Sequence, residues 1–269
     1  MGSLRPTRVV RLRESAFPTP AVRRELLTAT PEFAEGRPPV LFVPGFGQGA
    51  WVYGEHWLEH AAERGFPSYA MSLRGHGESQ AAPKAGLRAY VHDVVQVAAS
   101  LPRQAVLVGH GAGAFVVAQA LARYPARAGV LVAPVLGGPR VAVEVAARNP
   151  LATVPALFGG ALRPRRAQLF SRELPDTLAR DYAARLGRAS RRAQWQLLFA
   201  RPPEQPVGRP PVLVVGSPDD RLVPQVALTR AAGWYGVAPL LFPGMGHDLM
   251  LDTRWVEPIN AILDWLEKE

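Results

Sequence analysis

A histidine and a pair of carboxylates follow two apolar segments late in the chain. Asp219 and Asp220 come just after the segment that ends at Gly216, and His247 follows the one that ends at Phe242. A carboxylate that accepts a hydrogen bond from one ring nitrogen of a histidine fixes the tautomer of the ring and leaves the other nitrogen as a base near neutral pH. These residue types predict proton-transfer chemistry at His247.

A third segment, Val106–Gly113 (VLVGHGAG), runs from apolar residues into small ones. Glycines with this spacing allow a tight turn from a strand into a helix, and such a turn presents one side chain at the edge of a sheet. The presenting position is Gly111, which has no side chain to act as a nucleophile. His110 is expected to point back among the side chains beside the sheet, as a buried or hydrogen-bonded residue.

Short apolar segments alternate with amphipathic segments of helical length, which predicts an α/β fold with a mostly parallel central sheet and helices on both faces. In such a sheet the loops after the strands meet at one edge, where ligands bind. The predicted strands are Pro39–Val43, Ser68–Leu73, Ala105–Gly109, Gly129–Ala133, Pro211–Gly216 and Val237–Phe242, with antiparallel edge strands at Thr7–Arg13 and Val22–Thr30. The predicted helices are Val52–Arg64, Leu87–Ser100, Ala112–Tyr124, Pro224–Trp234 and Arg254–Lys268.

Residues 137–208 interrupt this alternation, because they contain several prolines and no strand pattern. We expect them to form a helical cap inserted into an α/β core that comprises residues 1–136 and 209–269. Apolar side chains of a cap can pack on the core, line a ligand cavity, or do both. The candidates for contact with a substrate are Trp51, Leu157, Phe158, Phe170, Trp195 and Met245.

The formal net charge of +9 comes mainly from one segment, since residues 137–209 contain 13 arginines and five acidic residues. These arginines are mixed with leucine, alanine and tryptophan, and an aromatic-rich RNA-binding signature is missing, so nucleic-acid binding is not expected. An anionic small molecule, or an acidic carrier protein at the arginine-rich cap, stays open as a partner.

Cysteine is absent, which excludes disulfides, thiolate metal sites and a cysteine nucleophile. No residue spacing indicates a metal site, and no nucleotide-binding glycine motif follows a predicted strand, so no metal or cofactor is expected. No apolar run approaches the roughly 20 residues of a membrane span, and the N-terminus lacks a signal-peptide pattern. A cytoplasmic protein without a membrane span is the expectation.

Five segments together resemble the α/β-hydrolase fold superfamily, and within it the small lysophospholipase and esterase-like group. The resemblance covers roughly residues 37–268. Chain order agrees with it, because the elbow position, the acid and the histidine occur in that order in this fold. The segments are Phe42–Trp51 (FVPGFGQGAW), Ser72–Ser79 (SLRGHGES), Val106–Gly113, Asp219–Pro224 and Gly244–Asp252.

By this resemblance, position 111 would hold a serine nucleophile and His247 would be its general base. The orienting acid would be Asp220, which the spacing to Leu222–Pro224 favours, or Asp219, which counting forward from Gly216 favours, and we prefer Asp220. A glycine in place of the serine rules out a covalent acyl-enzyme, and loss of the nucleophile leaves roughly 10³- to 10⁴-fold catalysis over water in such sites.

The resemblance also implies an oxyanion hole formed by the backbone amides of Phe46 and Ala112, which do not depend on their side chains. Here the family's usual His-Gly at the start of the oxyanion loop is Pro44-Gly45, a milder departure than the glycine at position 111.

Three functions remain open. The first is an enzyme whose His247–Asp220 pair is a general base on a mostly apolar acyl or carbonyl compound, either by activating water or by lyase- or cyclase-type proton transfer. The second is a non-catalytic protein that binds a ligand or partner. The third is an engineered serine-to-glycine knockout of a serine esterase or lipase at position 111.

Overall fold

The computed structural model describes residues 19–33, 36–148, 150 and 164–269 of the chain. Its centre is a seven-stranded sheet with the strand order β1-β3-β2-β4-β5-β6-β7. Neighbouring strands are parallel except for β1 and β3, which pair antiparallel. The strands are β1 (Leu26–Ala29), β2 (Val40–Val43), β3 (Ser68–Met71), β4 (Val106–His110), β5 (Ala128–Val132), β6 (Val212–Gly216) and β7 (Leu240–Leu241).

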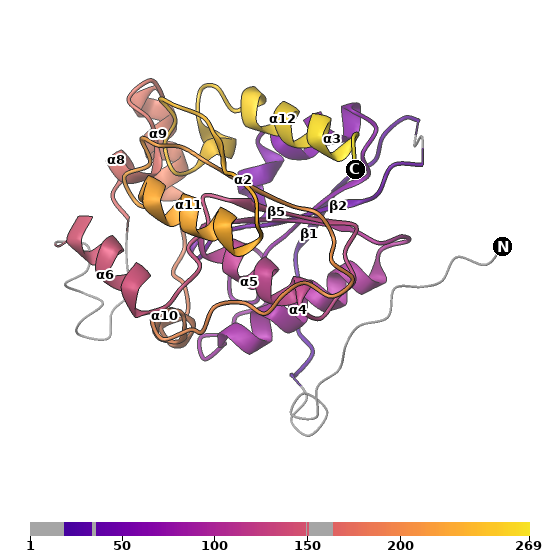
Figure 1. Ribbon diagram of the computed structural model, residues 1–269, viewed down its shortest axis with the longest axis horizontal. Coiled ribbons are helices and arrows are strands. Elements are labelled where there is room, and N and C mark those ends of the chain that lie inside the picture. The colour runs from indigo at the N-terminus through magenta and orange to yellow at the C-terminus, as the bar shows by residue number, and fades with distance from the viewer. Residues whose placement is uncertain (1–18, 34–35, 149, 151–163) are drawn as a thin grey trace.

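Helices cover both faces of the sheet, as Figure 1 shows. Helices α3 (Trp57–Glu63) and α12 (Val256–Leu266) lie on one face, and α4 (Leu87–Ser100) and α5 (Gly111–Leu121) lie on the other. The core elements that remain are α2 (Trp51–Gly54), α11 (Gln225–Trp234) and the short 3₁₀ helix η1 (Leu249–Leu251). The predicted α/β fold, with a mostly parallel sheet between two helical layers, is confirmed.

Individual elements differ from the prediction at their ends. The helix predicted at Val52–Arg64 is divided into α2 and α3, and α2 ends at Gly54, a poor helix former. The strand predicted at Val237–Phe242 shrinks to the two residues of β7, at the edge of the sheet, where only β6 offers a partner. The edge strand predicted within Val22–Thr30 is present as β1, whereas Thr7–Arg13 lies outside the described residues.

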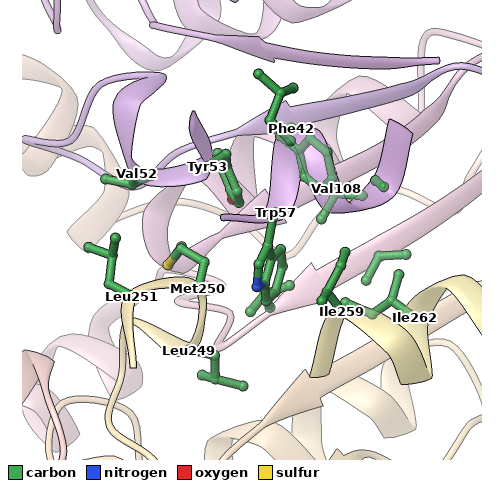
Figure 2. Packing of buried hydrophobic residues seen from close by; sticks show 14 of the residues in the cluster. Phe42, Val52, Tyr53, Trp57, Val108, Leu249, Met250, Leu251, Ile259 and Ile262 are labelled. Atoms are coloured by element: carbon green, nitrogen blue, oxygen red, sulfur yellow. The ribbon is translucent and has the colours of Figure 1, made fainter. Parts of the chain in front are cut away.

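One hydrophobic cluster anchors the loop that carries His247 (Figure 2). The three residues of η1, which begins two positions after His247, are buried in this cluster together with Trp57 of α3 and Ile259 of α12. Burial of a single large aliphatic side chain contributes about 1.5–3 kcal/mol. The position of His247 therefore depends on a well-packed element and not on its loop alone.

The segment between β5 and β6, called the insertion (residues 137–208), contains helices and no strand among its described residues. These helices are α6 (Pro139–Arg148), α8 (Arg166–Leu169), α9 (Asp176–Ala184) and α10 (Arg191–Leu198). In Figure 1 they lie together along one side of the molecule. Within the part of the chain that is described, no helix combines the length and apolar character that crossing a membrane requires.

Candidate active site

The turn between β4 and α5 brings three backbone segments close together. A Cβ on Gly109 would lie 2.7 Å from Cα of Ala114, and a Cβ on Gly113 would lie 2.2 Å from the carbonyl oxygen of Pro44. Both positions therefore require glycine. Gly111 is the first residue of α5, and its φ of 54° lies in the left-handed region, which glycine adopts with little strain.

At Gly111, unlike at its neighbours, a side chain would meet a single residue. A Cβ there would lie 3.2 Å from Nε2 of His247, and no other residue of the described chain, sequence neighbours aside, comes within 4 Å. A nitrogen–oxygen hydrogen bond spans the same distance. A serine side chain here would direct its hydroxyl toward Nε2 of His247, and without one a water molecule or substrate atom in the space beside Nε2 would be within proton-transfer reach.

His247 is paired with Asp220. The ring Nδ1 lies 2.7 Å from Oδ2 of the carboxylate, and both side chains are buried. The other carboxylate oxygen, Oδ1, accepts hydrogen bonds from the amides of Leu222 (2.7 Å) and Val223 (2.9 Å). This arrangement places a proton on Nδ1 of the histidine and leaves Nε2 as the basic nitrogen.

Two opposing effects act on the pKa of His247. Burial lowers it, because desolvation disfavours the imidazolium. The charge and hydrogen bond of Asp220, with a smaller contribution from the charge of Asp248, raise it more, so the net pKa lies above the ordinary histidine value. The histidine is thus a stronger base than a solvent-exposed imidazole.

Asp219, the alternative acid, has another contact. Its side chain is exposed, and its Oδ2 accepts a 2.7 Å hydrogen bond from the amide of Gly244. It therefore ties the loop after β6 to the loop that leads to His247. The carboxylate that contacts the histidine is that of Asp220.

Phe46 and Ala112 carry the two amides expected to form an oxyanion hole. Phe46 lies in the loop after β2, and Ala112 is the second residue of α5, where helical amides have no intrahelical acceptor. Among the described residues, neither amide donates to a protein acceptor. Both residues are half-buried, and within the described part of the chain no acceptor competes with a ligand for their amides.

The insertion contacts both loops of the site. The amide of Gly187 donates a 2.7 Å hydrogen bond to the carbonyl of Gly47, next to Phe46. On the other side, the amide of Asp248 donates to the carbonyl of Leu169 at 2.9 Å. A Cβ on Gly246 would lie 2.5 Å from the same carbonyl oxygen, so the insertion backbone packs directly on the loop before His247.

Three of the predicted substrate contacts pack inside the described protein. Trp51 is half-buried beneath Arg185 of the insertion, whose guanidinium carbon lies 3.9 Å from the ring centroid. Phe170 and Met245 are buried in the cluster that contains η1. They flank the loop of His247 from two sides, Phe170 from the insertion and Met245 from the chain just before it.

The other predicted contacts are placed differently. Trp195 is 46 % exposed and stacks on Phe199, which is 66 % exposed. These two rings form a pair at the surface, so the structure does not put Trp195 inside an enclosed pocket. Leu157 and Phe158 lie outside the described residues.

A cavity of about 430 Å³ lies elsewhere, between residues 19–22, the start of α4 and the helix α10. Its lining includes four cationic side chains, Arg74, Lys84, Arg88 and Arg192, and none of the predicted site residues. This cavity is therefore not the place where His247 would meet a substrate.

Comparison with known proteins agrees with this fold. The sequence profile of the alpha/beta hydrolase family matches residues 40–261, a range that contains Gly111, Asp220 and His247. The chain belongs to the alpha/beta hydrolase family. As a member of this family, it has the fold of a hydrolase-type enzyme, which its sequence predicted.

Solved structures of other alpha/beta hydrolases superpose on nearly the whole chain. A thermophilic esterase from Thermogutta terrifontis has 18% identity and a TM-score of 0.69 over 98% of this chain and 99% of its own. A monoacylglycerol lipase from Paleococcus ferrophilus has 22% identity and a TM-score of 0.66 over 92% and 98%. An esterase from a Rhodococcus species has 21% identity and a TM-score of 0.65 over 98% and 99%. No curated protein sequence matches the chain.

Behind the His247–Asp220 pair of this alpha/beta hydrolase lies a second buried group, formed by Gln48, His110 and Asp248. The rings of His110 and His247 are tilted against each other with centroids 4.6 Å apart. His110 is buried and hydrogen-bonded, as predicted. Sequence reasoning missed Gln48 and Asp248, because they are 200 residues apart and no motif connects them.

His110 and Asp248 of this group, together with His247, meet the first requirement for a metal site, since one ligand atom from each of the three lies within 4.8 Å of the others. The ring nitrogens, however, do not converge on one point. Nε2 of His110 faces the backbone carbonyl of His247, whose own nitrogens face Asp220 and Gly111. Metal ligation needs free lone pairs directed at a common centre, so we assign no metal ligand here.

Proposed function

We propose that the chain is an alpha/beta hydrolase that works without a covalent acyl-enzyme, with His247 as general base and Asp220 as the acid that orients it. The observation that carries this proposal is the 3.2 Å between Nε2 of His247 and the vacant Cβ position of Gly111. A serine at an elbow would direct its hydroxyl from that position toward the histidine, and here the space beside Nε2 can hold a reacting molecule in its place. The proposed substrate class is a mostly apolar acyl or carbonyl compound.

In the hydrolytic form of this reaction, a water molecule binds in the space that a serine hydroxyl would fill, and Nε2 of His247 removes one of its protons. The oxygen forms a bond to the acyl carbon, and the amides of Phe46 and Ala112 stabilise the oxyanion that develops. Asp220 stabilises the imidazolium. When the intermediate collapses, the bond from carbon to the leaving group breaks, and the proton passes from Nε2 to that group.

The same groups support a second reaction type, proton transfer within a lyase or cyclase. In this form Nε2 of His247 removes a proton from a carbon next to a carbonyl, or from a hydroxyl group. The two amides of the oxyanion hole then stabilise the enolate or alkoxide. Both reaction types need the base, the acid and the open space at Gly111 in the same geometry, so the same variants test them.

The proposal is tested with a panel of chromogenic esters and enolisable carbonyl compounds. Turnover by the unchanged protein is expected to vanish in His247→Ala. It should also vanish in Gly111→Ala, whose methyl group would lie 3.2 Å from Nε2 and block the approach of water or substrate. Mass spectrometry of the protein during turnover should give the mass of the unmodified chain. Undiminished turnover in His247→Ala, or an acyl adduct on the unchanged protein, would contradict the proposal.

A non-catalytic binding protein is the alternative, and the missing nucleophile favours it as much as it favours the first proposal. Under that alternative, no compound of the panel is turned over, and a ligand that binds does so equally well in His247→Ala. An engineered knockout predicts two results together: the unchanged protein turns over no compound of the panel, and Gly111→Ser hydrolyses esters as fast as an ordinary serine esterase.

A further inference from the structure

Hydrogen-bond acceptors surround both ring nitrogens of His110. Nδ1 lies 3.0 Å from Oε1 of Gln48. Nε2 lies 3.1 Å from the backbone carbonyl oxygen of His247 and 3.4 Å from Oδ1 of Asp248. The side chain is almost completely buried, so water cannot replace any of these contacts.

The orientation of the Gln48 amide is set by its neighbours. Its Oε1 accepts a 2.9 Å hydrogen bond from the amide of Gly45, which can only donate. Its Nε2 group therefore faces Oδ1 of Asp248, to which it donates at 3.0 Å. With Oε1 fixed as an acceptor, Nδ1 of His110 must be the donor. A neutral His110 would then turn the lone pair of Nε2 toward two oxygen acceptors, which is repulsive.

A proton between His110 and Asp248 removes this repulsion. We propose that Nε2 of His110 and Oδ1 of Asp248 share one proton, and that this shared proton holds the oxyanion loop and the histidine loop in register. Gln48 connects the pair to the oxyanion loop through Gly45, and Asp248 directly follows His247. The three side chains form a buried proton clamp, which consists of Gln48, His110 and Asp248.

The electrostatics of the pair agree with this assignment. Burial lowers the pKa of His110, and the charge of the nearby His247 lowers it further. Burial also raises the pKa of Asp248, to about 6. Both shifts place the proton nearer the carboxyl group than the ring, and the pair retains it at pH values below about 6. Oδ2 of Asp248 is buried and has no hydrogen-bond partner among the described residues, and such an oxygen is costly as part of a full carboxylate.

Other titratable groups also face this pair. The ring of His247 lies against His110, and Asp220 and Asp252 act on Asp248 through their charges. Tyr53 of α2 packs nearby, and its own pKa is raised by burial and by the charge of Asp248. Burial, together with the two further carboxylates, raises the pKa of Asp248 and outweighs the charge of His247 and the hydrogen bond from Gln48, which lower it.

The proton clamp deepens the proposed function, because it positions His247 and the amide of Phe46 relative to each other. Asp248 and His110 do not contact the substrate, so they are positioning residues. The existence of the shared proton does not depend on turnover. It is therefore measured in a way that remains valid when the proposed function fails.

The experiment is a pH titration of the full chain by NMR, between about pH 5 and pH 8. Histidine ring nitrogens and aspartate carboxyl carbons are labelled. His110 and Asp248 are expected to change together in one step near pH 6, since they share the proton that leaves. In Asp248→Asn this step should be lost and the pKa of His247 should fall. Asp219 is a carboxylate at the same edge of the sheet without a contact to His110. In Asp219→Asn, the shared titration step and the pKa of His247 should therefore both be unchanged.

Two results would overturn the proton clamp. One is an Asp248 carboxyl group that is already ionised at the acidic end of the titration while His110 stays constant. The other is a His110 step that survives in Asp248→Asn. If Asp248→Asn does not fold, Gln48→Glu replaces it, because the introduced carboxylate keeps an oxygen toward Gly45 while adding negative charge beside Asp248. The shared step must then move to higher pH, and an unmoved step overturns the proposal.

A kinetic readout then separates positioning from stability. In the Gly111→Ser background, breaking the clamp with Asp248→Asn should lower kcat for ester hydrolysis more than it raises KM, and it should shift the pH profile to the acidic side. A variant that is merely less stable would lose active protein without a shift of that profile. If Gly111→Ser shows no turnover, the NMR titration alone decides the proposal.

Discussion

The amide of Gly187 donates a 2.7 Å hydrogen bond to the carbonyl of Gly47, one residue after Phe46. The insertion is thereby joined to the loop that carries a proposed oxyanion donor. Arg185 reinforces this junction from the same segment, because its guanidinium lies over the ring of Trp51 and forms an ion pair with Glu55.

We expect Arg185→Ala to loosen this junction without unfolding the protein. The side chain is 43 % exposed, and such ion-pair and cation–π contacts each contribute about 1 kcal/mol or less. Hydrogen exchange at the Gly187 amide should become severalfold faster, while thermal stability changes little. Arg180→Ala, at an exposed position on α9, the helix that ends just before Arg185, is the matched control. Equal protection of Gly187 in both variants would show that Arg185 has no part in the junction.

The Gly111→Ser variant is expected to hydrolyse chromogenic esters. A serine there would bring its hydroxyl next to Nε2 of His247, once the histidine ring has moved away by a few tenths of an ångström. Since removing the nucleophile from a working triad costs about 10⁶-fold in kcat, a gain of at least roughly 10³-fold is expected if the register is intact. The left-handed φ at this position should cost about 1–3 kcal/mol of stability.

Gly111→Ala is the control for this variant, since it imposes the same backbone strain without a hydroxyl. It should lose stability and gain no esterase activity. A folded, inactive Gly111→Ser variant would mean that the site no longer fits ester hydrolysis, and would direct the search toward proton-transfer chemistry. Fast turnover would mean that an ordinary serine esterase site is still present apart from its nucleophile.

Replacement of Asp220 and replacement of Asp219 by asparagine should have very different effects on ester hydrolysis by the Gly111→Ser variant. Asp220→Asn removes the charge that orients His247 and stabilises its imidazolium, and kcat should fall by roughly 10²- to 10⁴-fold. Asp219→Asn changes an exposed contact to the amide of Gly244, and kcat should stay within a few-fold of the parent. Steady-state kinetics in the Gly111→Ser background measures both. A larger loss in Asp219→Asn would reassign the acid.

The raised pKa of His247 predicts the sign of one stability change with pH. Because the folded protein holds this proton more tightly than the unfolded chain, the pair with Asp220 adds stability that is complete below the ordinary histidine value of 6.5. This contribution is lost as the pH rises through the folded-state pKa. The difference in unfolding free energy between the unchanged protein and His247→Gln should therefore shrink with rising pH. Urea unfolding across this range measures it, and a growing difference would contradict the assigned direction.

Local patterns in the sequence were enough to predict the sheet and the convergence of His247, Asp220 and Gly111. Apolar runs predict buried parallel strands, and the ends of such strands must share an edge. The sequence did not decide between Asp219 and Asp220, because the side chains of two neighbouring residues differ mainly in the direction in which they point. The choice depends on the amides of Leu222 and Val223, which hold one oxygen of Asp220 while the other faces the histidine.

Other features could not be predicted from local patterns. Gln48, His110 and Asp248 come from two loops and the end of β4, and only the folded sheet brings them together. Trp195 shows what such patterns leave open, since it was predicted either to pack on the core or to line a ligand cavity, and in the structure it stacks on Phe199 at the surface. Hydrophobic periodicity identifies an apolar face, but it does not say what covers that face.

The close packing of Gly246 against Leu169 has a consequence for protein engineering. The insertion backbone fills the space in which any other residue at position 246 would place its side chain. A chimera that replaced residues 137–208 alone would set a foreign backbone against a loop shaped for this one. Crossover points should therefore be chosen so that residues 137–208 and 243–252 are exchanged as a matched set, although some 35 residues of core sequence separate them.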